Sequence, residues 1–162
     1  MEPATQTEFK PRFVDGKAMI VAGMSERVTP ETWDKIDKLW WRFAPHIGQV
    51  PGQIGARVAY GAVTDAANGI DYLAGVEVTS ASGLPDGFTH VSLPAQRYAV
   101  FTHDGHVSKL KDTMTAIWTW LPQSGHEQAR TAGAPAFFER YGEEFDPQTG
   151  MGGIEVWVPV KA

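Results

Sequence analysis

Runs of apolar residues and apolar stripes at helical spacing alternate along the chain and predict an ordered series of elements. The first half predicts one strand, one helix and two further strands, at 17–24, 29–47, 56–65 and 72–80. The second half predicts the same series at 96–105, 106–125, 134–145 and 152–160. A Ser-, Gly- and Pro-containing stretch at 80–88 separates the halves and predicts a linker.

The ends of the two helices carry residues typical of helix boundaries. Thr29 is placed to cap the first helix, Pro30 suits its first position, and Pro45 ends it. Pro122 and Gly125 end the second helix in the same way. Trp40 and Trp118 lie on the apolar stripes, so we expect both to belong to the core, whereas Trp41 and Trp120 fall outside the stripes.

The two halves match each other at a constant offset of 78 residues. Glu77 in "AGVEV" aligns with Glu155 in "GGIEV", and Trp40 aligns with Trp118. We therefore predict an α+β fold built from a tandem, pseudo-two-fold β-α-β-β repeat, with half-repeats at about 9–80 and 88–162 in one domain, 1–162. Each half would contribute antiparallel strands covered by one helix, with a ligand groove between the halves.

Composition narrows the class of function. The 162 residues are 43% hydrophobic and 20% charged, as in ordinary globular proteins, and the net charge is −5. This acidic balance argues against binding to a nucleic-acid backbone and is compatible with cationic ligands. The chain has no cysteine, and we expect neither a metal nor a cofactor. No signal-peptide or membrane-spanning pattern is present, so we expect a cytoplasmic protein without membrane attachment.

Strand alternation predicts where acidic and aromatic side chains gather. Glu77 in one half, and Glu155 with Trp157 in the other, fall on the sheet face opposite the apolar residues that pack under the helices. If 134–141 and 152–160 pair as a hairpin, Phe137, Glu139 and Tyr141 extend this acidic and aromatic patch on the helix-free face. The opposite interpretation is that Glu155 is a solvated strand residue and Trp157 a core residue.

The second half resembles the GyrI-like, or bacterial effector-binding, domain family. The resemblance rests on "YAVFTHDG", "WLPQSG", "FERY" and "GGIEVWVPVK", and covers most of the chain. Members of this family occur as drug-sensing domains of AraC-type and multidrug-responsive transcription activators and as free-standing proteins. The resemblance implies a duplicated β-α-β-β fold around a central groove that binds cationic, aromatic compounds.

The resemblance also implies the residues of a ligand site. Glu155 matches the family's acidic position, and Trp157 matches the aromatic position two residues later. Together with the strand pattern, this gives a set of expected ligand-binding residues: Glu155, Trp157, Tyr141, Glu139, Phe137, Glu77 and Tyr98. An aromatic face attracts a lipophilic cation and a carboxylate supplies the opposite charge, so these residue types suit the expected ligand.

Other functions are left open by the sequence. The first predicted strand begins too early for a preceding helix-turn-helix, so we expect no direct DNA binding. Some free-standing family members are hydrolases of cyclopropane-containing genotoxins, and in that case Glu155 or Glu139, with Tyr141, would be the catalytic candidates, a groove carboxylate acting as general base. A third class is a gyrase modulator or similar interaction module, using Trp41 or Trp120 toward a protein partner or a second copy.

Overall fold

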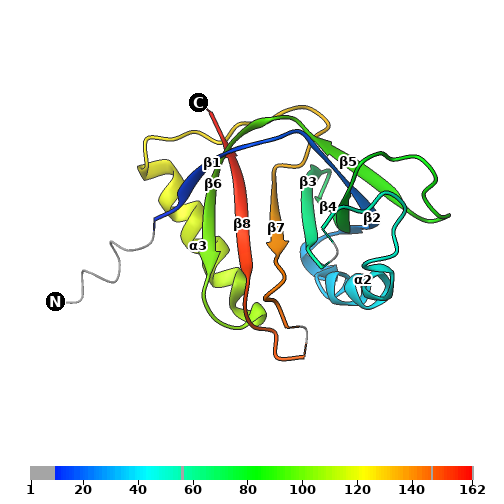
Figure 1. Cartoon of the computed structure of the whole chain (residues 1–162). Helices are drawn as coiled ribbons and strands as arrows, with labels where there is room; N and C mark the ends of the chain where they lie inside the picture. The colour runs from blue at the N-terminus through cyan, green and yellow to red at the C-terminus, as the bar shows by residue number, and fades with distance from the viewer. Residues whose placement is uncertain (1–9, 56, 147, 162) are drawn as a thin grey trace.

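The computed structural model describes residues 10–55, 57–146 and 148–161, whose strands form one antiparallel sheet with two α-helices (Figure 1). The eight strands are β1 (Arg12–Gly16), β2 (Met19–Val28), β3 (Ala59–Ala66), β4 (Gly69–Val78), β5 (Thr89–Leu93), β6 (Gln96–His103), β7 (Phe137–Tyr141) and β8 (Ile154–Val160). The helices are α2 (Lys35–Phe43) and α3 (Leu110–Trp120), flanked by the 3-10 turns η1 (Pro30–Thr32), η2 (Ala44–His46), η3 (Val107–Lys109) and η4 (Leu121–Gln123). The predicted α+β class is confirmed.

The strand order shows how the two halves of the chain interlock. It runs β1-β6-β8-β7-β3-β4-β2-β5, so β3 and β7 pair at the centre. Each edge strand pairs with the other half of the chain, because β1 lies beside β6 and β5 lies beside β2. The centre of the sheet is therefore also the boundary between the halves.

Two short edge strands were missing from the sequence prediction. The chain forms two strands, a helix and two strands in each half, whereas the sequence predicted one strand before each helix. β1 reads "RFVDG" and β5 reads "THVSL", and their short mixed patterns do not distinguish a strand from a loop. The duplication in sequence itself stays a prediction.

The 3-10 turns that precede the two helices begin with local side-chain bonds, whereas α2 and α3 themselves have no side-chain cap. At the start of η1 the backbone N–H of Thr29 donates to the hydroxyl of Thr32 over 2.9 Å, which satisfies a donor that the first turn leaves unpaired. Before α3, His106 accepts from the backbone N–H of Ser108 through its ring nitrogen. Buried His103 then bonds the carbonyl of His106 and the hydroxyl of Thr113, which fixes the end of β6 against α3.

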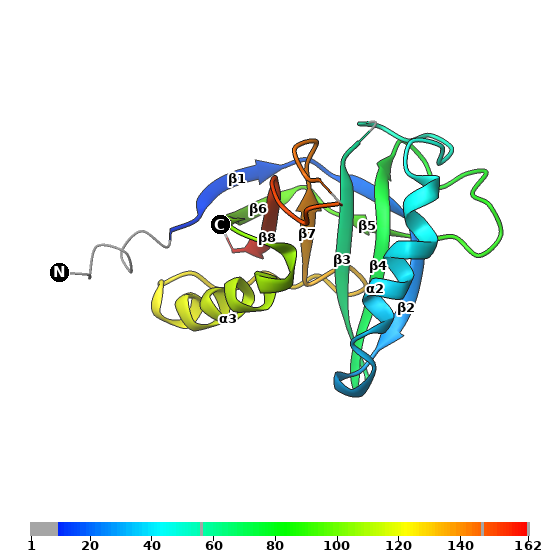
Figure 2. The ribbon, with the colours of Figure 1, turned by 90° about the horizontal axis from the view of Figure 1, so that it is seen from below.

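The two helices cover the same face of the sheet. Leu39 and Phe43 of α2 pack in one apolar cluster with Val76 and Val78, and Leu110 and Ile117 of α3 pack in another with the buried face of β8: Ile154, Val156 and Val158. This confirms the predicted core under the helices. Figure 2 shows β3 and β7 passing between α2 and α3, so the two central strands form the floor of the space between the helices.

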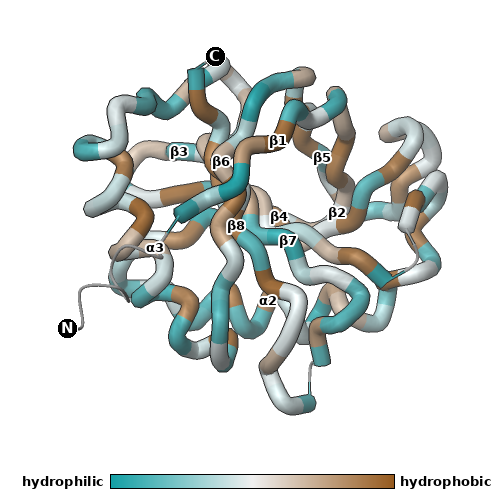
Figure 3. Tube along the Cα trace, turned by 60° about the vertical axis from the view of Figure 1, so that its left-hand side comes forward, coloured by the Kyte–Doolittle hydropathy of each residue, from teal (hydrophilic) through white to brown (hydrophobic). Residues whose placement is uncertain are grey.

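The helix-free face is also largely buried. Tyr60, Tyr98 and Phe138 are less than 10% exposed and share an apolar cluster with residues of β2 and β5. Hydrophobic segments run along the strands, and many of the connections between them are hydrophilic (Figure 3). None of the helices in the described part of the chain is long and apolar enough to cross a membrane.

Candidate functional site

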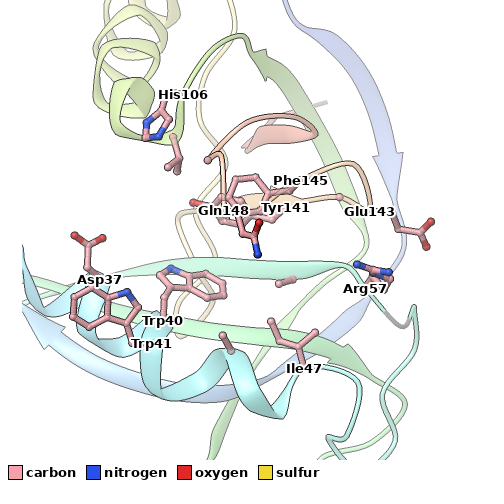
Figure 4. A pocket seen from close by; sticks show the side chains of 15 residues that line it. Asp37, Trp40, Trp41, Ile47, Arg57, His106, Tyr141, Glu143, Phe145 and Gln148 are labelled. Carbon is pink, nitrogen blue, oxygen red and sulfur yellow. The ribbon is translucent and has the colours of Figure 1, made fainter.

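A cavity of about 610 Å³ opens between the two helices at the end of the central strands (Figure 4). One wall comes from α2 and η2, and the other from the start of η3 and the connection between β7 and β8. The main lining side chains are Asp37, Trp40, Trp41, Ile47, Arg57, His106, Tyr141, Glu143, Phe145 and Gln148. This volume lies within the range of small-molecule sites.

Aromatic rings form the inner wall of the cavity. Trp40 meets Tyr141 edge to face, with ring centres 5.4 Å apart, and Tyr141 meets Phe145 at 5.1 Å. Trp41 is 74% exposed and lines the same cavity from the outer side of α2. Exposure of a large indole costs free energy in water, so Trp41 presents apolar surface that a ligand could cover.

The carboxylate of Glu139 does not line the cavity but is hydrogen-bonded to Tyr141, which does. Tyr141 and Tyr72 both donate to Oε1 of Glu139, over 2.9 and 2.7 Å. The indole N–H of Trp40 in turn donates to the hydroxyl of Tyr72 over 3.0 Å. Four side chains from α2, β4 and β7 thus form one network, and Trp40 and Tyr141 connect it to the cavity.

The second carboxylate oxygen of Glu139 is available. This oxygen makes no hydrogen bond with the described residues. Every fully buried side-chain polar atom in the described part of the chain has a partner, so an oxygen without one is not fully enclosed. Burial raises the pKa of the Glu139 carboxyl above its usual 4.5, although the bonds from Tyr72 and Tyr141 oppose the shift. The pKa values of Tyr72 and Tyr141 lie well above 10.0, chiefly because both side chains are buried and secondly because the charge of Glu139 is near.

The rim of the cavity is held by backbone contacts. The N–H of Val107 donates to the carbonyl of Gly150, which joins the start of α3 to the β7–β8 connection. The His106 ring lies against Gly150, where a Cβ would come within 2.5 Å of Nε2. Because Nδ1 of His106 accepts from the backbone of Ser108, the neutral ring carries its proton on Nε2.

Glu155 lies on the other face of the sheet and has its own partners. Arg12 donates to Oε2 over 2.9 Å, and the indole N–H of Trp157 donates to Oε1 over 2.9 Å. The guanidinium of Arg140 lies 3.8 Å from Oε1. The carboxylate therefore joins β1, β7 and β8, and its charge is balanced by two arginines.

The other residues expected on that face lie close to Glu155. Trp157 stacks on Phe138 at 5.4 Å and meets Tyr98 edge to face at 5.3 Å. Glu77 lies on the same face. Burial raises the pKa of Tyr60, Arg140 opposes this shift, and the charges of Glu77 and Glu155 add to it. Glu155, Trp157, Glu77 and Tyr98 thus share one face, as the strand alternation predicts.

The prediction of a single acidic and aromatic patch is wrong, because the structure divides its residues between the two faces of the sheet. The predicted hairpin forms, but Glu139 stands opposite Val156, while Glu155 stands opposite Arg140. Directly paired residues share a face, so Phe137, Glu139 and Tyr141 point to the helix side. A shift of one residue in register transfers every side chain of a strand to the other face, and alternation within each strand could not fix this register.

Most residues of the helix-side network and cavity were not predicted from the sequence, among them Trp40, Tyr72 and Asp37. Trp40 was expected in the core, yet it lines the cavity and bonds Tyr72, a residue that no pattern singled out. Asp37 also lines the cavity, one turn before Trp41. The one available signal was the Asp37–Trp41 spacing, which puts a carboxylate and an indole on the same side of a helix. Trp118 was expected in the core as well, but is 36% exposed and packs on Phe137.

Comparison with known proteins gives a consistent set of relatives. A family model, the GyrI-like small molecule binding domain, matches residues 9–161. The transcriptional regulator BrlR of Pseudomonas aeruginosa is 32% identical over 151 residues, which are 92% of this chain and 54% of BrlR, so the chain spans about half the length of that relative.

Solved structures show the same fold at low sequence identity. SAV2435, in a structure bound to tetraphenylphosphonium, superposes with a TM-score of 0.71 and 18% identity over 94% of both chains. The C-terminal domain of EcmrR superposes with a TM-score of 0.66 and 14% identity over 96% of this chain and 99% of that domain. At these identities the likeness concerns the fold alone.

Proposed function

Because the chain belongs to the GyrI-like small molecule binding domain family, we propose that it binds lipophilic aromatic cations in the cavity between α2 and α3. The observation that carries the proposal is the Glu139 carboxylate, held by Tyr72 and Tyr141 directly behind an aromatic wall. One half-buried negative charge beside aromatic rings recognises charge and aromatic surface without demanding a single ligand shape.

The electrostatics of the network favour a cation. A carboxylate removed from water is costly, and neutral hydroxyl donors compensate only part of that cost. The raised pKa of Glu139 reflects this balance. A permanent cation near Tyr141 would stabilise the ionised carboxylate of Glu139. Ligand binding would thereby offset the cost of removing this charge from water.

The aromatic wall supplies the second component of recognition. Trp40, Trp41 and Tyr141 line the cavity, and each ring face can contribute about 0.5–2 kcal/mol toward a cation. The binding of tetraphenylphosphonium by SAV2435, which shares the fold, supports a ligand of this class. The cavity volume of about 610 Å³ suits a compound with several rings.

In this proposal Glu139, rather than Glu155, supplies the charge. Arg12 and Arg140 already balance Glu155, and Trp157 occupies its second oxygen. We assign Glu155, with the neighbouring Trp157, Glu77 and Tyr98, to the stability of the helix-free face. Glu139 and Tyr141 then form the site together with Trp40 and Tyr72, while Phe137 supports the floor between the helices.

The test uses two ligands of nearly equal shape and opposite charge. Calorimetric titration with tetraphenylphosphonium should give saturable binding, and tetraphenylborate should bind far more weakly. Glu139→Gln keeps a carbonyl acceptor for the tyrosines but removes the charge, and should weaken phosphonium binding by about tenfold or more. Glu155→Gln is the matched control on the paired strand and opposite face, and should bind normally.

Two results would overturn the proposal. Equal binding of phosphonium and borate would show that ligand charge does not matter, and normal binding by Glu139→Gln would show that Glu139 does not supply the charge.

The hydrolase alternative is tested in the same samples by adding an electrophilic aromatic compound and recovering it. A binding protein returns it unchanged, whereas a general-base mechanism at Glu139 would consume it with a rate lost in Glu139→Gln.

A further inference from the structure

Arg57 gives the cavity a positive charge, which a site for simple cations does not need. Its side chain lines the cavity from the segment just before β3, at the opposite side from Asp37 and Trp41 (Figure 4). Among the described residues that line the cavity, it is the sole arginine or lysine. A fixed positive charge there repels a purely cationic ligand.

The guanidinium of Arg57 has no side-chain partner among the residues that the structure describes. In the described part of the chain Arg57 makes no side-chain hydrogen bond and no ion pair, although Glu143 also lines the cavity. Other arginines of the same chain do have carboxylate partners: Arg12, Arg27, Arg42, Arg97 and Arg130. An arginine kept free at a cavity rim has five donors ready for a planar acceptor such as a carboxylate.

The backbone that carries Arg57 is well anchored. The N–H of Val58 donates to the carbonyl of Gly55, the N–H of Ile54 donates to the carbonyl of Glu77, and Val58 is 8% exposed. Ala59, two residues after Arg57, lines the cavity and begins β3. The sheet therefore sets the position of the Arg57 backbone relative to the floor, so the exposed side chain starts from a defined point at the cavity rim.

We infer that Arg57 makes this site select zwitterionic ligands, in which an aromatic cation also carries a carboxylate or similar anionic group. This inference rests on the proposed function. The cationic rings would lie against Trp40, Trp41 and Tyr141, near the charge of Glu139, and the anionic group would face Arg57. Exposed or partly exposed pairs of this kind contribute modestly, so the effect is one of selectivity between similar ligands.

A pair of dyes with one chromophore isolates this contribution. Rhodamine 6G is an ethyl ester and a cation, and rhodamine 19 is the corresponding free acid, a zwitterion at neutral pH. Fluorescence polarisation should show that the wild-type protein binds rhodamine 19 about threefold to tenfold more tightly than rhodamine 6G. In Arg57→Gln the ratio should fall to about one, through weaker binding of the acid and tighter binding of the ester.

Two further variants separate a specific contact from a general charge effect. Lys17→Gln removes one positive charge from an exposed position outside the cavity and should keep the wild-type ratio. Arg57→Lys keeps the charge without the planar fork and should restore part of the preference. Equal affinities for the two dyes in the wild type, or a ratio that Arg57→Gln leaves unchanged, would overturn the inference while the proposed function stands. Failure of both dyes to bind would overturn the inference, and failure of tetraphenylphosphonium to bind as well would overturn the proposed function.

Discussion

The hydroxyl of Tyr72 donates a 2.7 Å hydrogen bond to Glu139 across the intervening strand β3, directly over Gly61. A Cβ atom at Gly61 would lie 2.1 Å from that hydroxyl and 2.8 Å from Oε1 of Glu139. The absence of a side chain at this position is therefore what allows β4 and β7 to share a hydrogen bond above the sheet.

Gly61→Ala should separate Tyr72 from Glu139. We expect a loss of about 1–3 kcal/mol in the free energy of unfolding, because the added methyl group overpacks the site and the hydrogen bond is lost. Urea denaturation measures this change. The effect should be smaller in a Tyr72→Phe background, where the nearest atom is already removed, and strictly additive effects of the two substitutions would contradict this explanation.

The raised pKa of Glu139 predicts a pH-dependent cost of folding. Burial holds the folded-state pKa above the usual 4.5, so the folded protein retains a proton that the unfolded chain has lost. Stability from this group is present below the unfolded-state pKa and is lost as the pH rises through the folded-state pKa. Glu139→Gln removes this titration. As the pH rises from the unfolded-state to the folded-state pKa, the unfolding free energy of this variant should therefore increase relative to that of the wild type. A constant difference from about pH 4 to about pH 8 would contradict the assignment.

The sequence predicted the framework of the fold well, for identifiable physical reasons. The valines of β4 and β8 alternate strictly, and the apolar stripe at helical spacing was enough to predict α2. The predicted bounds of that helix were too wide, because Thr29 precedes the 3-10 turn η1 and Pro45 lies in the 3-10 turn η2. The edge strands β1 and β5 have few apolar residues and depend on pairing with the distant strands β6 and β2. That stabilisation is tertiary, and local sequence does not carry it.

The candidate site was predicted in part, because its residues meet through long-range contacts. Glu139 and Tyr141 were among the expected residues, but they were placed with Glu155 on the wrong side of the sheet. Tyr72 is 67 residues from Glu139 in sequence, and Trp40 is 32 residues from Tyr72. Side-chain alternation within a strand gives two possible faces, and the register between strands decides which face meets the helices.

The contact between Arg12 and Glu155 should contribute to stability and not to ligand binding. Glu155→Gln keeps an acceptor for Trp157 but removes the ion pair, and the exposed arginine limits the loss to about 0.5–1 kcal/mol. Urea denaturation should show that salt reduces the difference from the wild type. Arg12→Gln should cost a similar amount, and the double variant little more. If folded Glu155→Gln lost phosphonium binding, the ligand site would have to include the helix-free face.

Trp41 and Trp33 provide a matched pair for testing the outer wall of the cavity. Both indoles are exposed, by 74% and 57%, but Trp41 lines the cavity and Trp33 does not. Trp41→Ala should weaken tetraphenylphosphonium binding by about 0.5–1 kcal/mol, or about twofold to fivefold, because one aromatic face toward the cation is lost. Trp33→Ala should leave the affinity unchanged, and both variants should keep their unfolding free energy within about 0.5 kcal/mol. Calorimetry and urea denaturation of the two variants check this directly. Equal losses of affinity in both would indicate that the cation associates with exposed indoles in general, and would contradict a site confined to the cavity.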